Sequence, residues 1–190
     1  MQFQRMCAVM ALALVGSAAA KAQLAPDAAY PGSGLTRQQI MDRLTAADYR
    51  SAPSVADGKV VFENLCSGCH LFGDLGAAVG PDLSTVASRF KKKDILDSIL
   101  WPSRTISDQY AMVTFTLDDG TTESGMVTRE DATYVFVRNA AHMEGRGLPI
   151  PLARIKDRKD STVSLMPESL LAPLKLTQID NLVAFLLTGK

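Results

Sequence analysis

The sequence predicts a mainly α-helical domain with an inserted small antiparallel β-sheet, α+β overall. Apolar residues recur with helical spacing before residue 100 and again near the C-terminus. Between these regions, residues 111–138 form short segments rich in β-branched and aromatic residues, separated by turn residues. A chain of 190 residues, 47% of them hydrophobic, is long enough for one such domain with its own core.

The N-terminus has the features of an export signal in the expected order. Residues 1–5 carry one positive charge, and an apolar run and a group of small residues follow. We expect cleavage after Ala20 or Ala22, so residues 1–22 are the signal peptide of a periplasmic protein. Because the apolar run is too short to span a bilayer, we expect no transmembrane anchor after cleavage.

The rest of the chain divides into two parts. Proline, glycine and serine residues interrupt residues 23–53, which we expect to form a linker with one short helix. Residues 54–190 are expected to form the main domain, with the β insertion at about residues 107–160. No internal repeat suggests a further division.

Capping residues mark where the helices begin. Thr36 precedes the short helix, and Ser54 precedes a longer one that runs to about Cys66. Residues 92–100 carry their apolar side chains on one helical face, and Thr177 is expected to cap the last helix. The expected strands of the insertion are residues 111–116, 121–128, 133–138 and 148–155.

The most specific feature is the pentapeptide Cys66-Ser67-Gly68-Cys69-His70, a C-x-x-C-H motif typical of covalent haem attachment. Two thiols three residues apart on a helical turn can bond the two vinyl groups on one edge of a porphyrin. The histidine that follows then offers an imidazole nitrogen to the iron. We therefore predict one haem c, attached through Cys66 and Cys69, with His70 as an iron ligand.

Other uses of the cysteine pair fit the sequence less well. A thioredoxin-like redox pair belongs to a βαβ unit, whereas a capped helix precedes this pair. A structural zinc site needs four ligands, and the chain without its signal has only two cysteines and two histidines. With 20 basic and 20 acidic residues, the chain also lacks the excess of positive charge typical of proteins that bind nucleic acid.

An electron carrier needs a sixth iron ligand that stays bound in both oxidation states, and a methionine thioether in this place raises the reduction potential. Met166 is our first choice, because it lies shortly before the last helix and Pro167 stiffens its loop. Other residues remain open for this role: Met143, Met112, Met126 and, as a second histidine, His142. The two methionines in expected strands are more simply explained as core residues.

These features together resemble a class I c-type cytochrome. The matching residues are Gly58, Phe62, the motif itself, Gly80-Pro81-Asp82-Leu83, Met166-Pro167 and Leu182-Val183-Ala184-Phe185-Leu186. The resemblance implies a cytochrome c fold in which the first and last helices cross at Gly58, with Phe62 and Phe185 beside the crossing. It also implies that the Pro81 carbonyl orients the histidine ligand, and that Leu83 and Leu165 contact the haem.

The chain is more closely similar to a bacterial haem-binding domain that is often fused to β-propeller sugar-dehydrogenase-like proteins. This resemblance covers about Val55 to Leu187. It includes Gly80-Pro81-Asp82-Leu83, Ile99-Leu100-x-Pro102-Ser103-Arg104-x-Ile106, Tyr110, Asp119-Gly120, Gly125 and Ser164-Leu165-Met166-Pro167. His70 and Met166 lie 96 positions apart in the chain (166 − 70), and the β insertion falls within this interval. Since this chain has no propeller segment, we expect no dehydrogenase activity of its own.

Several cationic or polar residues are candidates for a role near the haem. Arg89, Trp101 and Arg104 are suited to hydrogen bonds with the haem propionates, although an ordinary surface position explains Arg89 equally well. Residues 91–93 are three lysines that would suit an acidic redox partner, but a solvated helix start explains them more simply.

The predicted function is one-electron transfer rather than catalysis. The partners are expected to be a dehydrogenase as donor and a cytochrome or oxidase as acceptor. One alternative is a haem subunit or domain that docks a dehydrogenase or terminal oxidase. Another is a ligand-binding or peroxidase-like haem protein, for which His142 is the candidate polar residue beside the open iron site.

Overall fold

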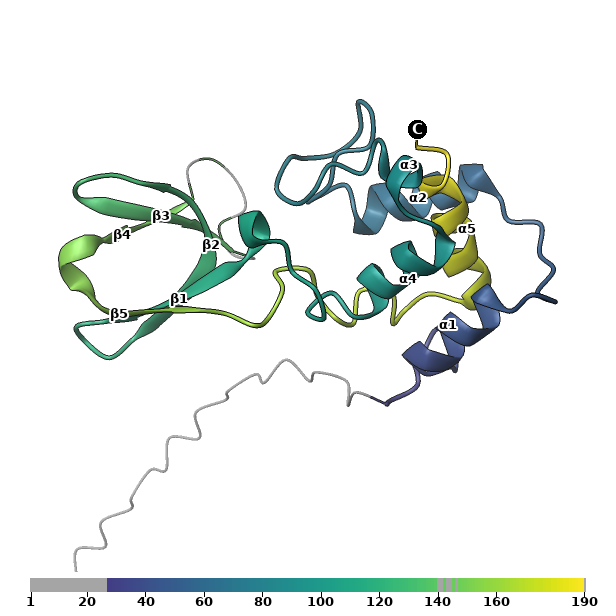
Figure 1. The fold of residues 1–190 in the computed structure, drawn as a ribbon, viewed down its shortest axis with the longest axis horizontal. Coiled ribbons are helices and arrows are strands. Elements are labelled where there is room, and N and C mark those ends of the chain that lie inside the picture. Colours follow the sequence, from purple (N-terminus) through teal and green to yellow (C-terminus); the bar gives the residue numbers. More distant parts are fainter. Residues whose placement is uncertain (1–26, 140–141, 143–144, 146, 190) are drawn as a thin grey trace, which may run out of the picture.

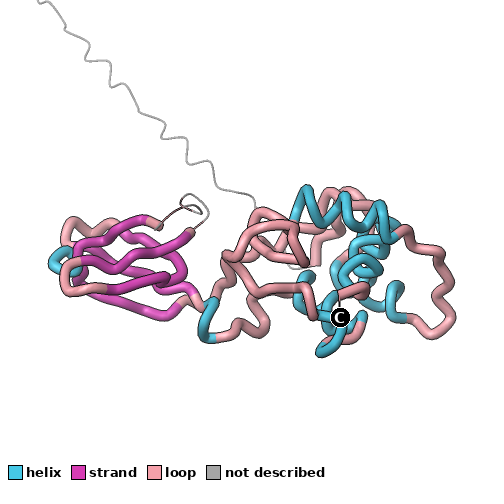
Figure 2. Tube along the Cα trace, turned by 90° about the horizontal axis from the view of Figure 1, so that it is seen from above, coloured by secondary structure: helices cyan, strands magenta, loops and turns pink. Residues whose placement is uncertain are grey.

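A computed structural model describes residues 27–139, 142, 145 and 147–189, so the predicted signal peptide and Met143 lie outside the described residues. The α-helices and the strands occupy opposite ends of the molecule (Figure 1), and loops and the short helix η1 join the two parts (Figure 2). The helices are α1 (Arg37–Thr45), α2 (Val55–Leu65), α3 (Val86–Arg89), α4 (Lys92–Leu100), η1 (Asp108–Tyr110), η2 (Leu152–Arg154) and α5 (Leu176–Leu186). The strands are β1 (Met112–Leu117), β2 (Thr122–Glu130), β3 (Tyr134–Arg138), β4 (Leu148–Pro151) and β5 (Ile155–Asp160).

The helical part is built around the crossing of α2 and α5. Gly58 permits this crossing, because a Cβ atom there would lie 2.0 Å from the carbonyl oxygen of Asn181. The rings of Phe62 and Phe185 lie beside it with centroids 5.5 Å apart, and Phe72 packs against Phe185 at 4.5 Å. The crossing that the resemblance implied is confirmed. In the part of the chain that the structure describes, no helix is both long enough and apolar enough to cross a membrane.

Capping side chains begin two of the helices where the sequence predicted. Thr36 precedes α1 and Ser54 precedes α2, and each side chain accepts a hydrogen bond from a backbone N–H of the first turn. The predicted start of α5 was wrong. The helix begins after Lys175, whose N–H donates to the side-chain oxygen of Gln178 at 3.0 Å, so Thr177 lies inside the first turn.

The strands form one antiparallel sheet in the order β4-β3-β2-β1-β5. Its two edge strands, β4 and β5, are joined only by η2, so the sheet has to curl to bring its edges together (Figure 1). The prediction of one strand over residues 148–155 was wrong, because β4 ends at Pro151 and β5 continues to Asp160. The sheet has its own core, separate from that of the helices: Val113, Phe115, Leu117, Val135, Val137 and Ile150.

Candidate functional site

The C-x-x-C-H motif directly follows α2. The N–H of Cys66 still donates to the carbonyl oxygen of Phe62 at 2.8 Å, as in a helix. The N–H groups of Cys69 and His70 then both donate to the carbonyl oxygen of Cys66, at 3.0 and 2.9 Å. The motif is therefore one further turn at the end of α2, and this helix is fixed in place by its crossing with α5.

Neither cysteine forms a disulfide bond in the structure. Cys66 lies in the helical core with 7% of its surface exposed, and Cys69 is half-buried. Burial, and to a smaller extent the neighbouring Cys69, raises the pKa of the Cys66 thiol to about 12. Burial also raises the pKa of Cys69. A thioredoxin-like pair needs a thiolate with a lowered pKa, so these values argue against that alternative.

A backbone carbonyl orients the imidazole of His70. Its Nδ1 lies 2.8 Å from the carbonyl oxygen of Pro81. Because a carbonyl oxygen only accepts hydrogen bonds, Nδ1 carries the proton and Nε2 keeps its lone pair for a metal. Burial lowers the pKa of His70 by more than the Pro81 hydrogen bond raises it, so the ring is neutral at neutral pH.

The loop after the motif folds back against it. The N–H groups of Val79 and Gly80 donate to the carbonyl oxygen of Cys69, at 3.0 and 2.7 Å. A Cβ atom at Gly80 would lie 2.7 Å from Cε1 of His70, so a side chain here would displace the ring. The loop thus fixes the position of the imidazole through Gly80 and keeps the proton on Nδ1 through the Pro81 carbonyl.

Met166 lies in the loop that leads from β5 to α5. Its N–H donates to Oγ of Ser164 at 3.1 Å, and the N–H of Ser164 donates to Oγ of Ser103 at 3.2 Å. The loop is therefore tied to the segment that follows α4. These hydrogen bonds set the path of the backbone as it approaches Met166.

His70 and Met166 line the same hollow. The lining residues come from the motif and the loop after it, from the Met166 loop and from the insertion: Leu65, Cys69, His70, Val79, Gly80, Pro81, Tyr110, Met126, Ser164, Leu165, Met166, Pro167 and Leu170. Most of these side chains are apolar. An imidazole nitrogen and a thioether sulfur therefore share a mainly apolar hollow.

A model of the cytochrome c family matches residues 55–190. The chain belongs to the cytochrome c family. It is therefore a haem-binding electron-transfer protein that works with redox partner proteins. The match begins at the first residue of α2, so α1 lies outside it. Comparison with curated proteins gave no match.

The hollow of this cytochrome fits a haem. Its apolar walls suit the porphyrin face, and Cys69 lies among them. Nε2 of His70 retains a lone pair, and Met166 brings to the hollow a thioether sulfur, a kind of donor that haem iron accepts in cytochromes. Cys66, His70 and Cys69 lie on one helical turn, so the residues that would hold the cofactor share one support.

The structure brings part of the predicted site together. The predicted residues that line the hollow are Cys69, His70, Pro81, Leu165 and Met166. Leu83 packs against the helical core instead. Met112 pairs with Met126 across the sheet and does not line the hollow.

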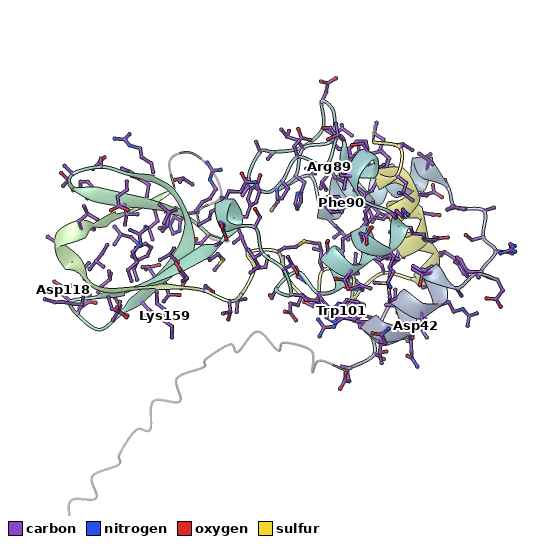
Figure 3. All side chains as sticks on the ribbon, viewed as in Figure 1. Asp42, Arg89, Phe90, Trp101, Asp118 and Lys159 are labelled. Carbon is purple, nitrogen blue, oxygen red and sulfur yellow. The ribbon has the colours of Figure 1, made fainter. Side chains whose placement is uncertain are left out.

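The predicted propionate-binding residues do not line the hollow in this structure. The guanidinium of Arg104 lies 4.3 Å from the ring centroid of Trp101 and forms an ion pair with Asp97. Arg89 is the exposed last residue of α3, and its guanidinium lies 5.6 Å from the ring centroid of Phe90 (Figure 3). These side chains make local contacts with neighbours in the chain.

Two other candidates also have partners within the protein. Nζ of Lys92 lies 2.7 Å from Oδ1 of Asp180, whose side chain is buried, so this lysine holds α4 against α5. His142 is exposed, and its Nδ1 lies 3.2 Å from Oδ1 of Asn139. Neither residue is among those that line the hollow.

Sequence reasoning missed the contribution of the insertion to the hollow. Met126 is only 8% exposed, yet it belongs to neither hydrophobic core. The expectation that Met126 fills the core of the sheet is wrong. Met126 lies beside Met112, on the face of the sheet opposite to that of Val113. On that face it lines the hollow together with Tyr110. The alternation along the strand shows this face, but it does not show what covers it.

Proposed function

We propose that the protein is a periplasmic c-type cytochrome with one haem. In this proposal, Cys66 and Cys69 bind the haem covalently, and His70 and Met166 ligate the iron. The helical part is a cytochrome c fold, and the sheet is an insertion in it. The protein carries single electrons from a dehydrogenase to a cytochrome or oxidase. One observation carries the proposal. His70, whose Nδ1 is hydrogen-bonded to the carbonyl oxygen of Pro81, lines the same hollow as Met166.

A haem bound in this hollow supplies the reversible one-electron change at its iron. The residues of the chain set the conditions for that change. The Pro81 carbonyl holds the proton on Nδ1 and makes Nε2 a better donor, while burial keeps the ring neutral. The thioether of Met166 favours the reduced state. The apolar walls exclude water, which also disfavours the more highly charged oxidised state.

The two cysteines keep the cofactor attached. Cys66 lies in the helical core and Cys69 at the edge of the hollow, one turn apart on the extension of α2. Their sulfurs would form thioethers that fix the porphyrin edge to this helix. The next residue, His70, would then supply Nε2 to the iron.

Carbon monoxide binding to the reduced protein tests the assignment of Met166. In the proposal, six-coordinate iron makes the wild type bind carbon monoxide weakly, whereas Met166→Ala opens a coordination position and binds it readily. Met112→Ala is the matched control, because Met112 lies in β1 and does not line the hollow. Equal binding by the wild type and Met166→Ala would refute Met166 as the ligand. Ready binding in both would favour a ligand-binding haem protein, and weak binding in both would indicate a different sixth ligand.

A further inference from the structure

We propose that residues 27–45, a segment outside the family match, position the Met166 loop for the iron. Tyr30 and Arg37 do this by holding Glu168, which lies two residues after Met166. The inference rests on the proposed function, in which Met166 is an iron ligand. Neither Tyr30 nor Arg37 lines the hollow, so both are positioning residues.

The contacts with Glu168 involve both its backbone and its side chain. The hydroxyl of Tyr30 donates to the backbone carbonyl of Glu168 at 2.8 Å. Nη1 of Arg37 lies 3.0 Å from the carboxylate of Glu168 and 3.1 Å from the carbonyl oxygen of Leu100, the last residue of α4. The segment therefore ties the Met166 loop to the end of α4.

Tyr30 and Arg37 are buried, whereas the Glu168 side chain is 40% exposed, so the contacts are restricted mainly from the side of Tyr30 and Arg37. Tyr30 is 2% exposed and Arg37 is 8% exposed. The guanidinium also lies 5.9 Å from the ring centroid of Trp101, which Figure 3 shows close to α1. A buried guanidinium is costly when it loses an acceptor, so its fixed acceptors define where the loop can lie.

The backbone of the same segment lies directly against the chain after Glu168. The N–H of Gly32 donates to the carbonyl oxygen of Ala172 at 2.9 Å. A Cβ atom at Gly32 would lie 2.2 Å from the carbonyl oxygen of Pro173. The segment thus contacts the chain at Glu168 and again at Ala172, which limits the freedom of the Met166 loop on its C-terminal side.

This restraint matters because a methionine sulfur is a weak ligand that an added base can replace. When the loop is fixed, little conformational entropy is lost as the sulfur binds. When the loop is loose, the sulfur leaves more easily and imidazole competes better. The affinity of the oxidised protein for imidazole therefore reports how well the loop is positioned.

The test is an imidazole titration of the full haem-loaded protein in its oxidised form. We expect Tyr30→Phe to bind imidazole about two- to tenfold more tightly than the wild type, and Arg37→Gln about tenfold or more. Tyr49→Phe and Arg43→Gln are the matched controls, because they make the same changes in the same part of the chain without touching Glu168. Both controls should stay within about twofold of the wild type.

The same titration in a Met166→Ala background separates positioning from a general effect on folding. Without the methionine, Tyr30→Phe should no longer change imidazole affinity. An equal effect in both backgrounds would overturn the inference, as would an unchanged affinity for Tyr30→Phe with Met166 present. If Arg37→Gln fails to fold, Tyr30→Phe decides the question alone. Equal affinities of the wild type and Met166→Ala would instead refute the proposed ligand itself.

Discussion

The crossing of α2 and α5 gives a prediction whose size follows from the structure. In Gly58→Ala, the new Cβ would lie 2.0 Å from the carbonyl oxygen of Asn181 and 2.9 Å from Cβ of Phe185. The nearest atom belongs to the backbone, so no rotamer change relieves the contact. Since Cβ contacts below 3.0 Å are essentially never observed, the helices have to move apart by about 1 Å.

Such a movement costs free energy twice. Forcing an extra methyl into a packed contact costs about 1–3 kcal/mol. A gap of this size also forfeits a quarter to a half of the dispersion energy of the affected contacts, which include Phe62 and Phe185. We expect a total loss of roughly 3 kcal/mol, which for a chain of this length lowers Tm by roughly 6–12 °C.

Thermal unfolding of the haem-loaded protein, followed by the helical circular dichroism signal, measures this loss. Gly68→Ala is the matched control, because a Cβ atom there meets nothing within 4 Å and its φ is not left-handed. The control should unfold within about 2 °C of the wild type. If Gly58→Ala unfolds at the same temperature as the control, the close approach of the helices is not what Gly58 provides.

The remaining predictions concern the hollow and the sheet. Gly80→Ala should tilt His70 away from its carbonyl acceptor and make the ring a poorer donor, so a redox titration should give a raised potential. Met126→Ala should admit water to the hollow and lower the reduction potential. Met126→Leu is the control and should keep a potential near that of the wild type. If Met126→Ala has the same potential as the wild type, the insertion does not shield the site. Hydrogen bonds from Thr121, followed by Arg154, lower the pKa of Asp119 from 3.8 to about 2. The contribution of this carboxylate to the stability of the fold is therefore complete above pH 3.8 and is lost as the pH falls toward 2. An NMR titration of Asp119 with a midpoint near 3.8 would contradict this prediction.

Local signals in the sequence predicted most of the elements. Ser54 and Thr36 begin helices because their side chains accept hydrogen bonds from backbone groups of the first turn, and such caps act within a few residues. The apolar stripe of residues 92–100 gave the bounds of α4 correctly. The alternating segments between residues 111 and 138 gave three strands with errors of one or two residues.

The features that were missed depend on contacts between distant segments. β5 is a polar, exposed edge strand, so its sequence carries no hydrophobic alternation. The burial of Arg37 depends on Glu168, which is 131 residues away in the chain. Met126 faces the hollow only because the sheet lies beside the Met166 loop. In each case the partner that explains the residue comes from another element, and periodicity within one segment does not contain that information.

Covalent attachment of haem is the central claim, and the mass of the intact protein tests it most directly. The chain should be produced in a host that matures c-type cytochromes, and Cys66→Ser and Cys69→Ser should be prepared in parallel. We expect the wild type to carry the added mass of one haem after denaturation, and the double variant to lose it. A wild-type protein that is colourless and has the mass of the bare polypeptide would contradict the account.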